Sequence, residues 1–298
     1  LTAAQSIVAG ERDIVLAGGV EAMSRVPYLL EGVRFGHKMG NQRVTDAMYR
    51  DGFLCPLCDQ VMGETAETLA DRYAIDRAAQ DRFAAASQNR CEQARKAGLF
   101  DDEIVPVPVP GPKGTALFRD DEHPRDGVTP ESLGSLPPVF RKNGTVHAGN
   151  SSGLVDGAAA CVVLSEEEAG RRGVAPMARL TAWAVAGVPP EIMGIGPVPA
   201  VRDLLKRTGL GLGDIDLVEL NEAFAVQVLA CARDLELDLA RVNVQGGAIA
   251  LGHPIGASGA RIVATLLHAM RRRHARRGLA TLCISGGQGI AALFESAA

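Results

Sequence analysis

Three segments of the sequence combine side chains that can move protons with glycines that let a backbone approach a ligand. His253 lies inside a glycine-rich block at residues 243–259, and Cys283 precedes Ser285 and another run of glycines. A polar pair, Asn221 and Glu222, follows a short apolar stretch. A histidine and a cysteine with tuned pKa values can exchange protons near neutral pH. Exposed N–H groups of a glycine-rich turn can hold an anion. These segments therefore combine a histidine and a cysteine that could take part in chemistry with turns whose exposed amides make a ligand site possible.

Each segment also has a purely structural interpretation. Asn221 could cap a helix, because asparagine is a preferred N-cap residue. Cys283 could be a buried strand-end cysteine that behaves as a small apolar side chain. A single histidine is most often structural, although His253 stands between a glycine and a proline ahead of a predicted helix. Both interpretations stay open at this point.

The elements that must position these residues alternate regularly after residue 178. Alternation of this kind predicts a mostly parallel sheet covered on both faces. Ligands bind such sheets at the carboxyl ends of the strands, where the three segments fall. The helix after Ser258 is apolar almost all round and should be buried between layers. The predicted strands span residues 178–186, 217–220, 242–244, 280–284 and 290–294, and the helices span residues 199–208, 223–235 and 258–273.

The first residues have the pattern of a segment from inside a fold. Residues 1–9 predict an apolar helix without a capping residue, and residues 13–17 predict a buried strand of parallel type. A helix followed by such a strand implies an earlier strand, so the sequence predicts an upstream segment that it does not contain. Residues 26–146 predict an accessory region, with helices at residues 65–73 and 77–97 and a proline-rich extended stretch. A further apolar strand is predicted at residues 157–164.

Composition excludes several classes of function. The net charge of −4 gives no general attraction to nucleic acid, and no apolar run approaches the roughly 18 residues of a membrane span. Six scattered cysteines indicate a reducing compartment, and we expect a cytoplasmic protein. Cys55 and Cys58 have redox or zinc spacing, but no second ligand pair is suitably spaced. We expect this pair in a loop without a ligand, and no metal.

Taken together, the segments resemble the signatures of the thiolase family. The resemblance rests on NEAFA at residues 221–225, GGAIALGHPIGASG at residues 246–259 and CISGGQGIA at residues 283–291. Residues 17–25 and 144–160 also agree, and the matches follow the family's order along the whole chain. The resemblance implies an α/β thiolase fold, with αβαβα layers and two related half-domains of mixed, mostly parallel sheets.

On this resemblance the first half-domain is incomplete. Residues 1–25 would be its remnant, residues 26–146 the loop domain, residues 147–170 its last strand region and residues 171–298 the C-terminal half-domain. The helix at residues 1–9 matches the latter half of the helix that begins with the family's nucleophilic cysteine. That cysteine would lie about two turns upstream of Leu1, so we expect this chain alone to be inactive.

The resemblance also implies a role for each site residue. His253 would accept the proton of the nucleophile and donate to the thioester oxygen. Cys283 would be the acid and base at the α-carbon of the second acyl-CoA. Asn221 would hold a water that completes an oxyanion hole with His253, and the amide of Ser285 would serve a second oxyanion hole.

The implied enzyme is an acetyl-CoA C-acyltransferase that cleaves 3-ketoacyl-CoA with CoA, or runs the reverse Claisen condensation, in fatty acid metabolism. Coenzyme A would be a substrate held at Ser152 and Met62, not a bound cofactor, and the complete protein would be a homodimer or homotetramer. Neither a membrane nor nucleic acid is an expected partner. Ser285 replaces a glycine of many relatives, and Val61 stands where relatives specialised for acetoacetyl-CoA often have histidine.

Three rival interpretations are weaker or narrower. A ketoacyl-carrier-protein synthase shares the architecture but has a second histidine where Asn221 stands. A non-catalytic thiolase-like fragment that binds acyl-CoA or a partner subunit would also fit a chain without the nucleophile. A dinucleotide-binding protein is disfavoured because residues 252–259 lack the G-x-G-x-x-G spacing.

Overall fold

A computed structural model describes residues 1–112 and 114–297 of the chain. Its largest sheet has four strands in the order β10–β11–β12–β9. β10 runs parallel to β11, whereas the β11–β12 and β12–β9 pairs are antiparallel. The prediction of a mostly parallel sheet is therefore wrong here. The reason is the three-residue turn at residues 285–287, because so short a connection can only join antiparallel strands. The strands are β9 (Ala178–Gly187), β10 (Leu217–Leu220), β11 (Arg277–Ile284) and β12 (Gln288–Ser296).

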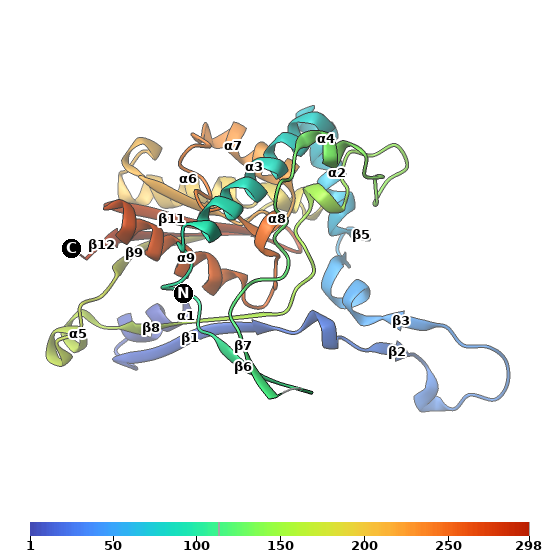
Figure 1. Ribbon diagram of the computed structural model, residues 1–298, viewed down its shortest axis with the longest axis horizontal. Coiled ribbons are helices and arrows are strands. Elements are labelled where there is room, and N and C mark those ends of the chain that lie inside the picture. Colours follow the sequence, from blue (N-terminus) through green and yellow to red (C-terminus); the bar gives the residue numbers. More distant parts are fainter. Residues whose placement is uncertain (113, 298) are drawn as a thin grey trace.

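Helices cover both faces of this sheet (Figure 1). α6 (Pro197–Thr208) packs on β9 and β12, and α7 (Ala225–Leu235) lies beside it in one core that includes Leu204 and Leu279. α9 (Ser258–Arg273) packs on the opposite face, against β10 and β11. The helices and the strands alike bury small aliphatic side chains, as the composition predicts.

A second sheet lies on the far side of α9. β1 (Ile14–Glu21) pairs antiparallel with β8 (Gly157–Leu164), and both strands contact α9. The predicted burial of α9 between layers is thus confirmed. The expectation that β1 is a strand of parallel type is wrong for its described pairing. α1 (Thr2–Val8) also contacts this sheet, and Leu1 packs against the α9 core.

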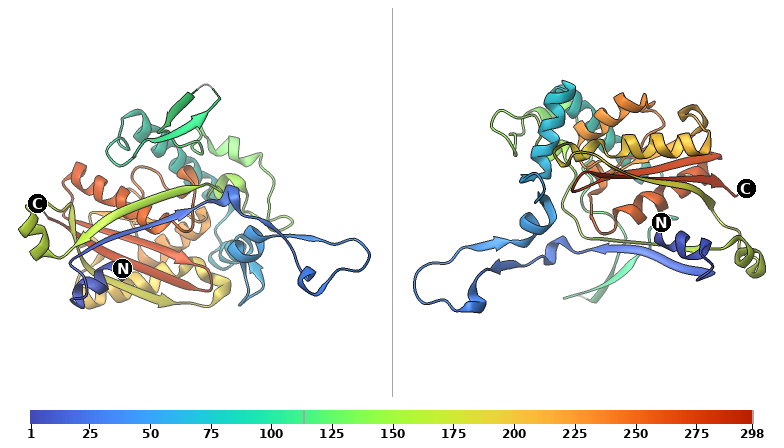
Figure 2. Two further views of the ribbon diagram at one scale, coloured as in Figure 1. Left: turned by 90° about the horizontal axis from the view of Figure 1, so that it is seen from below. Right: turned by 180° about the vertical axis from the view of Figure 1, so that it is seen from behind.

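The region between β1 and β8 projects from these layers. α2 (Met62–Tyr73) and α3 (Arg77–Lys96) form the predicted helix pair, and the Asp76 carboxylate caps α3 by accepting from the Ala79 N–H. The β2–β3 hairpin extends away from the body in two views (Figure 2). The remaining strands are β2 (Tyr28–Leu30), β3 (Val44–Asp46), β4 (Leu54–Cys55), β5 (Gln60–Val61), β6 (Val107–Gly111) and β7 (Gly114–Phe118). The other α-helices are α4 (Pro130–Gly134), α5 (Glu166–Arg172) and α8 (Ala248–Leu251), and short helical turns are η1 (Met23–Arg25), η2 (Val33–Phe35), η3 (Met48–Phe53), η4 (Ala148–Asn150), η5 (Pro190–Ile195) and η6 (Leu212–Asp214).

One predicted strand is absent from the described part of the chain. Residues 242–244 make only isolated parallel bridges, between Val218 and Val242 and between Val244 and Gly246. Asn243 has φ of +46°, a left-handed conformation that a continuous strand does not tolerate. Across the described ranges, no helix is long and apolar enough to cross a membrane.

Candidate active site

The loop after β10 begins with a buried asparagine. Asn221 is 1% exposed, and its backbone N–H donates to the Thr281 carbonyl on β11 at 3.0 Å. The interpretation of Asn221 as a helix cap is wrong, because α7 is preceded by Phe224 as its N-cap residue. Its side chain is therefore available for a contact other than capping.

Glu222 joins this loop to the glycine-rich block. Its carboxylate accepts from Ser87 Oγ at 2.6 Å, Asn243 Nδ2 at 2.8 Å and the Ile249 N–H at 3.1 Å. Burial raises the pKa of Glu222, while these three donors act in the opposite direction. Gly247 is required beside it, since a Cβ there would lie 2.3 Å from Glu222 Cδ. These contacts fix the start of the block that carries the histidine.

His253 is held through both its backbone and its ring. Its N–H donates to the Gly153 carbonyl at 3.0 Å, and its Nδ1 lies 2.5 Å from Ser258 Oγ. The Ser258 hydroxyl donates to the Pro254 carbonyl at 2.9 Å. A hydroxyl has one proton, so Ser258 Oγ must accept from Nδ1–H. The neutral ring therefore carries its proton on Nδ1 and leaves the Nε2 lone pair free.

The free nitrogen faces the asparagine. Asn221 Nδ2 lies 3.3 Å from His253 Nε2, which joins the loop after β10 to the glycine-rich block. Burial, together with a smaller effect of the positive charge of Arg261, lowers the pKa of His253 to about 4. The imidazole is thus neutral near pH 7. A neutral imidazole with an unprotonated Nε2 beside an amide donor can accept a proton and then donate it back.

Cys283 lies near the end of β11, in a core cluster with Phe224 and Met193. Burial raises the pKa of its thiol to about 12, so the thiol is protonated near pH 7. Asn221 connects this strand to the histidine, because its backbone bonds to Thr281, two residues before Cys283. Ser285 is exposed in the turn that follows, where Gly286 and Gly287 have φ of +84° and +86°.

The two residues predicted to hold CoA approach the same loop. The Ser152 N–H donates to the Ala223 carbonyl at 3.0 Å, beside a backbone bridge between Ser151 and Phe224. Met62 is partly buried against the cluster that contains Phe224 and Cys283. Ser152 and Met62 therefore both contact the segment that follows Asn221, Ser152 through the Ala223 carbonyl and Met62 through the cluster that contains Phe224 and Cys283.

Known protein families include one whose two domain models match most of this chain. Residues 1–167 match the family model described as thiolase, N-terminal domain, and residues 174–296 match thiolase, C-terminal domain. The chain belongs to the thiolase family. An acetyl-CoA acetyltransferase of Paracoccus denitrificans is 53% identical over 98% of this chain and 75% of its own length. The Escherichia coli acetyl-CoA acetyltransferase is 52% identical over 98% of this chain and 75% of its own length.

Solved thiolases share the fold closely. The acetyl-CoA acetyltransferase of Bacillus anthracis has a TM-score of 0.96 at 45% identity, over 99% of this chain and 75% of its own. Human mitochondrial 3-ketoacyl-CoA thiolase, solved in complex with CoA, has a TM-score of 0.93 at 47% identity, over 98% of this chain and 73% of its own. These comparisons do not bear out the prediction of an incomplete first half-domain. That the nucleophile lies upstream of Leu1 stays a prediction.

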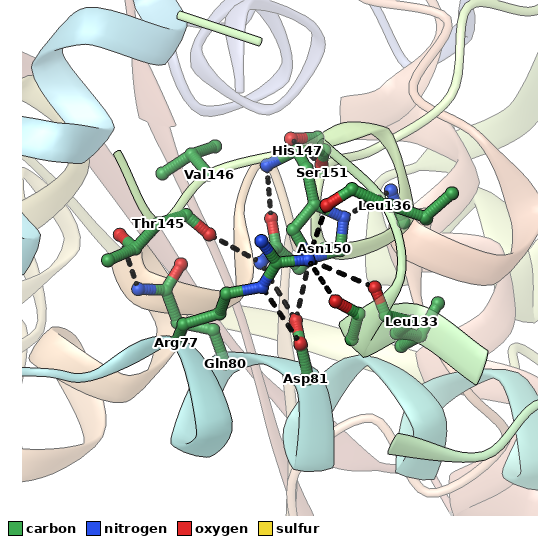
Figure 3. A network of polar contacts seen from close by, with 12 residues as sticks. Arg77, Gln80, Asp81, Leu133, Leu136, Thr145, Val146, His147, Asn150 and Ser151 are labelled. Atoms are coloured by element: carbon green, nitrogen blue, oxygen red, sulfur yellow. Dashed lines mark hydrogen bonds and ion pairs between the residues drawn. The ribbon is translucent and has the colours of Figure 1, made fainter. Parts of the chain in front are cut away.

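A buried polar network positions the segment that carries Ser152 (Figure 3). Asp81 of α3 accepts from His147 Nε2 at 2.7 Å and from Asn150 Nδ2 at 3.1 Å. His147 Nδ1 accepts from the Gly149 N–H at 3.1 Å, so the proton of this ring is on Nε2. Burial lowers the pKa of His147, which is neutral. In this thiolase the accessory helix α3 thus anchors the loop that holds Ser152 against the active site.

Sequence reasoning missed the supporting residues of the site. Ser258 was available as a signal, since it lies in the same glycine-rich block, five residues after His253. Ser87 and Asp81 carried no comparable signal, because both lie in α3, far from the site in sequence. That His253 and Cys283 face one cavity stays a prediction.

Proposed function

We propose that the natural protein that carries this thiolase chain catalyses acyl transfer between CoA thioesters, cleaving a 3-ketoacyl-CoA with CoA or running the reverse Claisen condensation. Relatives that are about half identical are named acetyl-CoA acetyltransferases, and a solved 3-ketoacyl-CoA thiolase binds CoA. The single observation that carries the proposal is the neutral His253, whose Nε2 lies 3.3 Å from the Asn221 amide.

His253 would act as base and then as donor. Its Nε2 lone pair accepts the proton of a nucleophilic thiol, and the resulting N–H then donates to the thioester oxygen as negative charge develops there. Asn221 stands beside that position. Its Oδ1 is buried and has no hydrogen-bond partner among the described residues, which suits an acceptor that orients a water.

Cys283 would exchange the proton at the α-carbon. In the cleavage direction the acetyl-CoA enolate takes the thiol proton, and in condensation the thiolate removes a proton from acetyl-CoA. Burial keeps the thiol protonated near pH 7, which suits the cleavage step. The Ser285 N–H, in a turn formed by left-handed glycines, would stabilise the enolate oxygen.

Ser152 and Met62 would contact the pantetheine arm of CoA. The support is that both residues contact the segment at residues 223–224, which lies two to three residues after Asn221. Coenzyme A is then a substrate that leaves after each turnover. Homodimer or homotetramer formation and a cytoplasmic location belong to the same proposal.

The test separates proton exchange from binding. Acetyl-CoA is incubated with the protein in D₂O, and loss of methyl protons is followed by NMR, while calorimetry measures CoA affinity. Cys283→Ala should slow exchange by on the order of 10²-fold or more and keep CoA affinity. Cys91→Ala removes another buried cysteine, in α3, and should change neither. An unchanged exchange rate in Cys283→Ala would refute its role, and CoA binding without any exchange in the unaltered protein would favour the non-catalytic alternative.

A further inference from the structure

The Cys55/Cys58 pair takes no part in the proposed acyl transfer. β4 pairs with β5 through Leu54 opposite Val61 and Cys55 opposite Gln60. The turn between them is closed by the Asp59 N–H, which donates to the Cys55 carbonyl at 2.8 Å. The side chains of Cys55 and Cys58 are hydrogen-bonded to each other, so the two sulfur atoms are in contact. The hairpin therefore brings together the two thiols that a disulfide would join.

The two thiols differ sharply in their surroundings. Cys55 is 0% exposed, whereas Cys58 is only partly buried and adjoins the exposed Leu57. Burial raises the pKa of Cys55, but the Leu57 N–H, the Cys58 thiol and the N–H groups of Cys58 and Gly286 together lower it below its ordinary value. Burial and the neighbouring Cys55 raise the pKa of Cys58. One sulfur is thus stabilised as a thiolate and its contacting neighbour as a thiol.

A metal does not account for this pair. No group of three or more histidine, cysteine, aspartate or glutamate side chains in the described part of the chain could hold an ion. A pair in which one thiol is activated and the other can reach solvent has the features of a dithiol that undergoes disulfide exchange.

We propose that Cys55 and Cys58 form a redox-active dithiol that exchanges with low-molecular-weight disulfides and closes to a Cys55–Cys58 disulfide. The accessible Cys58 thiol loses its proton as its sulfur attacks one sulfur of the external disulfide, which forms a mixed disulfide, and the proton passes to the thiolate that is released. Cys55 then attacks the Cys58 sulfur, forms the intramolecular disulfide and displaces the second thiolate. The two protein thiols are oxidised by two electrons in total, the external disulfide is reduced to two thiols, and the two protein protons pass to those thiols.

The dithiol also contacts the turn that carries Ser285. The Gly286 N–H interacts with the Cys55 sulfur, and a Cβ on Gly286 would lie 3.6 Å from Leu57 Cδ1. A thiolate accepts a hydrogen bond more strongly than a disulfide sulfur, because charged acceptors form the stronger bonds. Oxidation should therefore weaken the hydrogen bond from the Gly286 N–H to the Cys55 sulfur and increase the mobility of residues 285–287.

The chemistry is tested on the unaltered protein in buffers of glutathione and glutathione disulfide. Remaining thiols are capped with N-ethylmaleimide, and intact and peptide masses are measured. We expect two caps to disappear together as the buffer becomes oxidising, with a disulfide mapped to one peptide that contains residues 55 and 58. Cys55→Ser should stop at a glutathione adduct on Cys58, and Cys161→Ser should leave pair formation unchanged.

Continued capping of both Cys55 and Cys58 in buffers that oxidise ordinary dithiols would overturn the proposal. So would a stable glutathione adduct on Cys58 in the unaltered protein, because Cys55 would then fail to displace it. A second measurement follows amide hydrogen exchange in the oxidised and reduced protein. Faster exchange at residues 285–287 on oxidation, by about 5-fold or more, would support the contact with the turn, and equal exchange would refute it. Neither measurement depends on acyl-transfer activity.

Discussion

Replacing Ser258 with alanine tests the proton arrangement of the site without touching a group that reacts. Ser258 is 0% exposed, and its hydroxyl links His253 Nδ1 to the Pro254 carbonyl. The substitution leaves His253 Nδ1 without a partner, whereas the Pro254 carbonyl still accepts from the N–H groups of Ala257 and residue 258. A buried group left unpaired costs roughly 1–3 kcal/mol, which sets the expected loss in the free energy of unfolding.

The same loss bears on activity through the position of the ring proton. Ser258 favours the tautomer with the proton on Nδ1, and only that tautomer leaves Nε2 free to accept one. When Nε2 takes a proton, the imidazolium that forms also donates from Nδ1–H to Ser258 Oγ. A hydrogen bond to a charged group is worth roughly 1.5–3 kcal/mol, so its loss should lower kcat by roughly 10- to 100-fold. CoA affinity should change little, because Ser258 contacts the ring and not the predicted CoA-binding residues.

The assay is 3-ketoacyl-CoA thiolysis by the natural protein that carries this sequence, together with urea unfolding of each variant. Ser258→Thr keeps the hydroxyl and should restore most of kcat. Ser165→Ala is the matched control, because Ser165 caps α5 by accepting from the Glu168 N–H at 3.2 Å, remote from the site in sequence. It should cost about 0.5–2 kcal/mol of stability with normal turnover. Full activity in Ser258→Ala would refute the tautomer argument.

Three further predictions concern the supports of the site. The pKa of His253 is lowered from 6.5 to about 4, so the neutral ring contributes on the order of 3 kcal/mol to the free energy of unfolding above about pH 6.5, and this contribution is lost as the pH falls through about 4. Urea unfolding of His253→Asn should show a smaller loss of stability over this pH range. Equal losses in the two proteins would contradict the prediction. Glu222→Ala leaves three donors without their acceptor and should lower the free energy of unfolding by roughly 3 kcal/mol or more. A loss below about 1 kcal/mol would mean that the loop after β10 and the glycine-rich block do not depend on this carboxylate. Gly252 has φ of +91°, and a Cβ there would lie 2.5 Å from Val155. Gly252→Ala should therefore lower the free energy of unfolding by about 1–3 kcal/mol more than Gly209→Ala, where φ is +69° and the space is open. Equal losses would argue against close packing before His253.

The bounds of helices and strands could be predicted from the sequence where local signals determine them. α9 begins and ends at the predicted residues, Ser258 and Arg273, because its apolar pattern ends in a run of arginines. β10 and β8 also have their predicted bounds. The direction of the sheet was not predictable in the same way, because alternating elements suggested crossovers. The short turn after Ile284 reverses the chain instead.

The residues of the candidate site were likewise predictable only where a local sequence signal marked them. The glycine-rich block identified His253, and the structure places it against Asn221, which is 32 residues away in sequence. Asp81 and Ser87 escaped prediction because helix α3 brings them to the site from more than 130 residues upstream of Asn221 and Glu222. Such contacts follow from tertiary packing, which no periodicity within α3 reveals.

The most direct test of the account is the turnover of the natural protein with His253 replaced by alanine. The account assigns His253 both proton acceptance and oxyanion stabilisation. Each contribution is worth on the order of 10²–10⁴-fold, so thiolysis of a 3-ketoacyl-CoA with CoA should fall by at least about 10²-fold while CoA binding persists. Turnover within a few-fold of the unaltered protein would show that His253 is structural and would contradict the central claim.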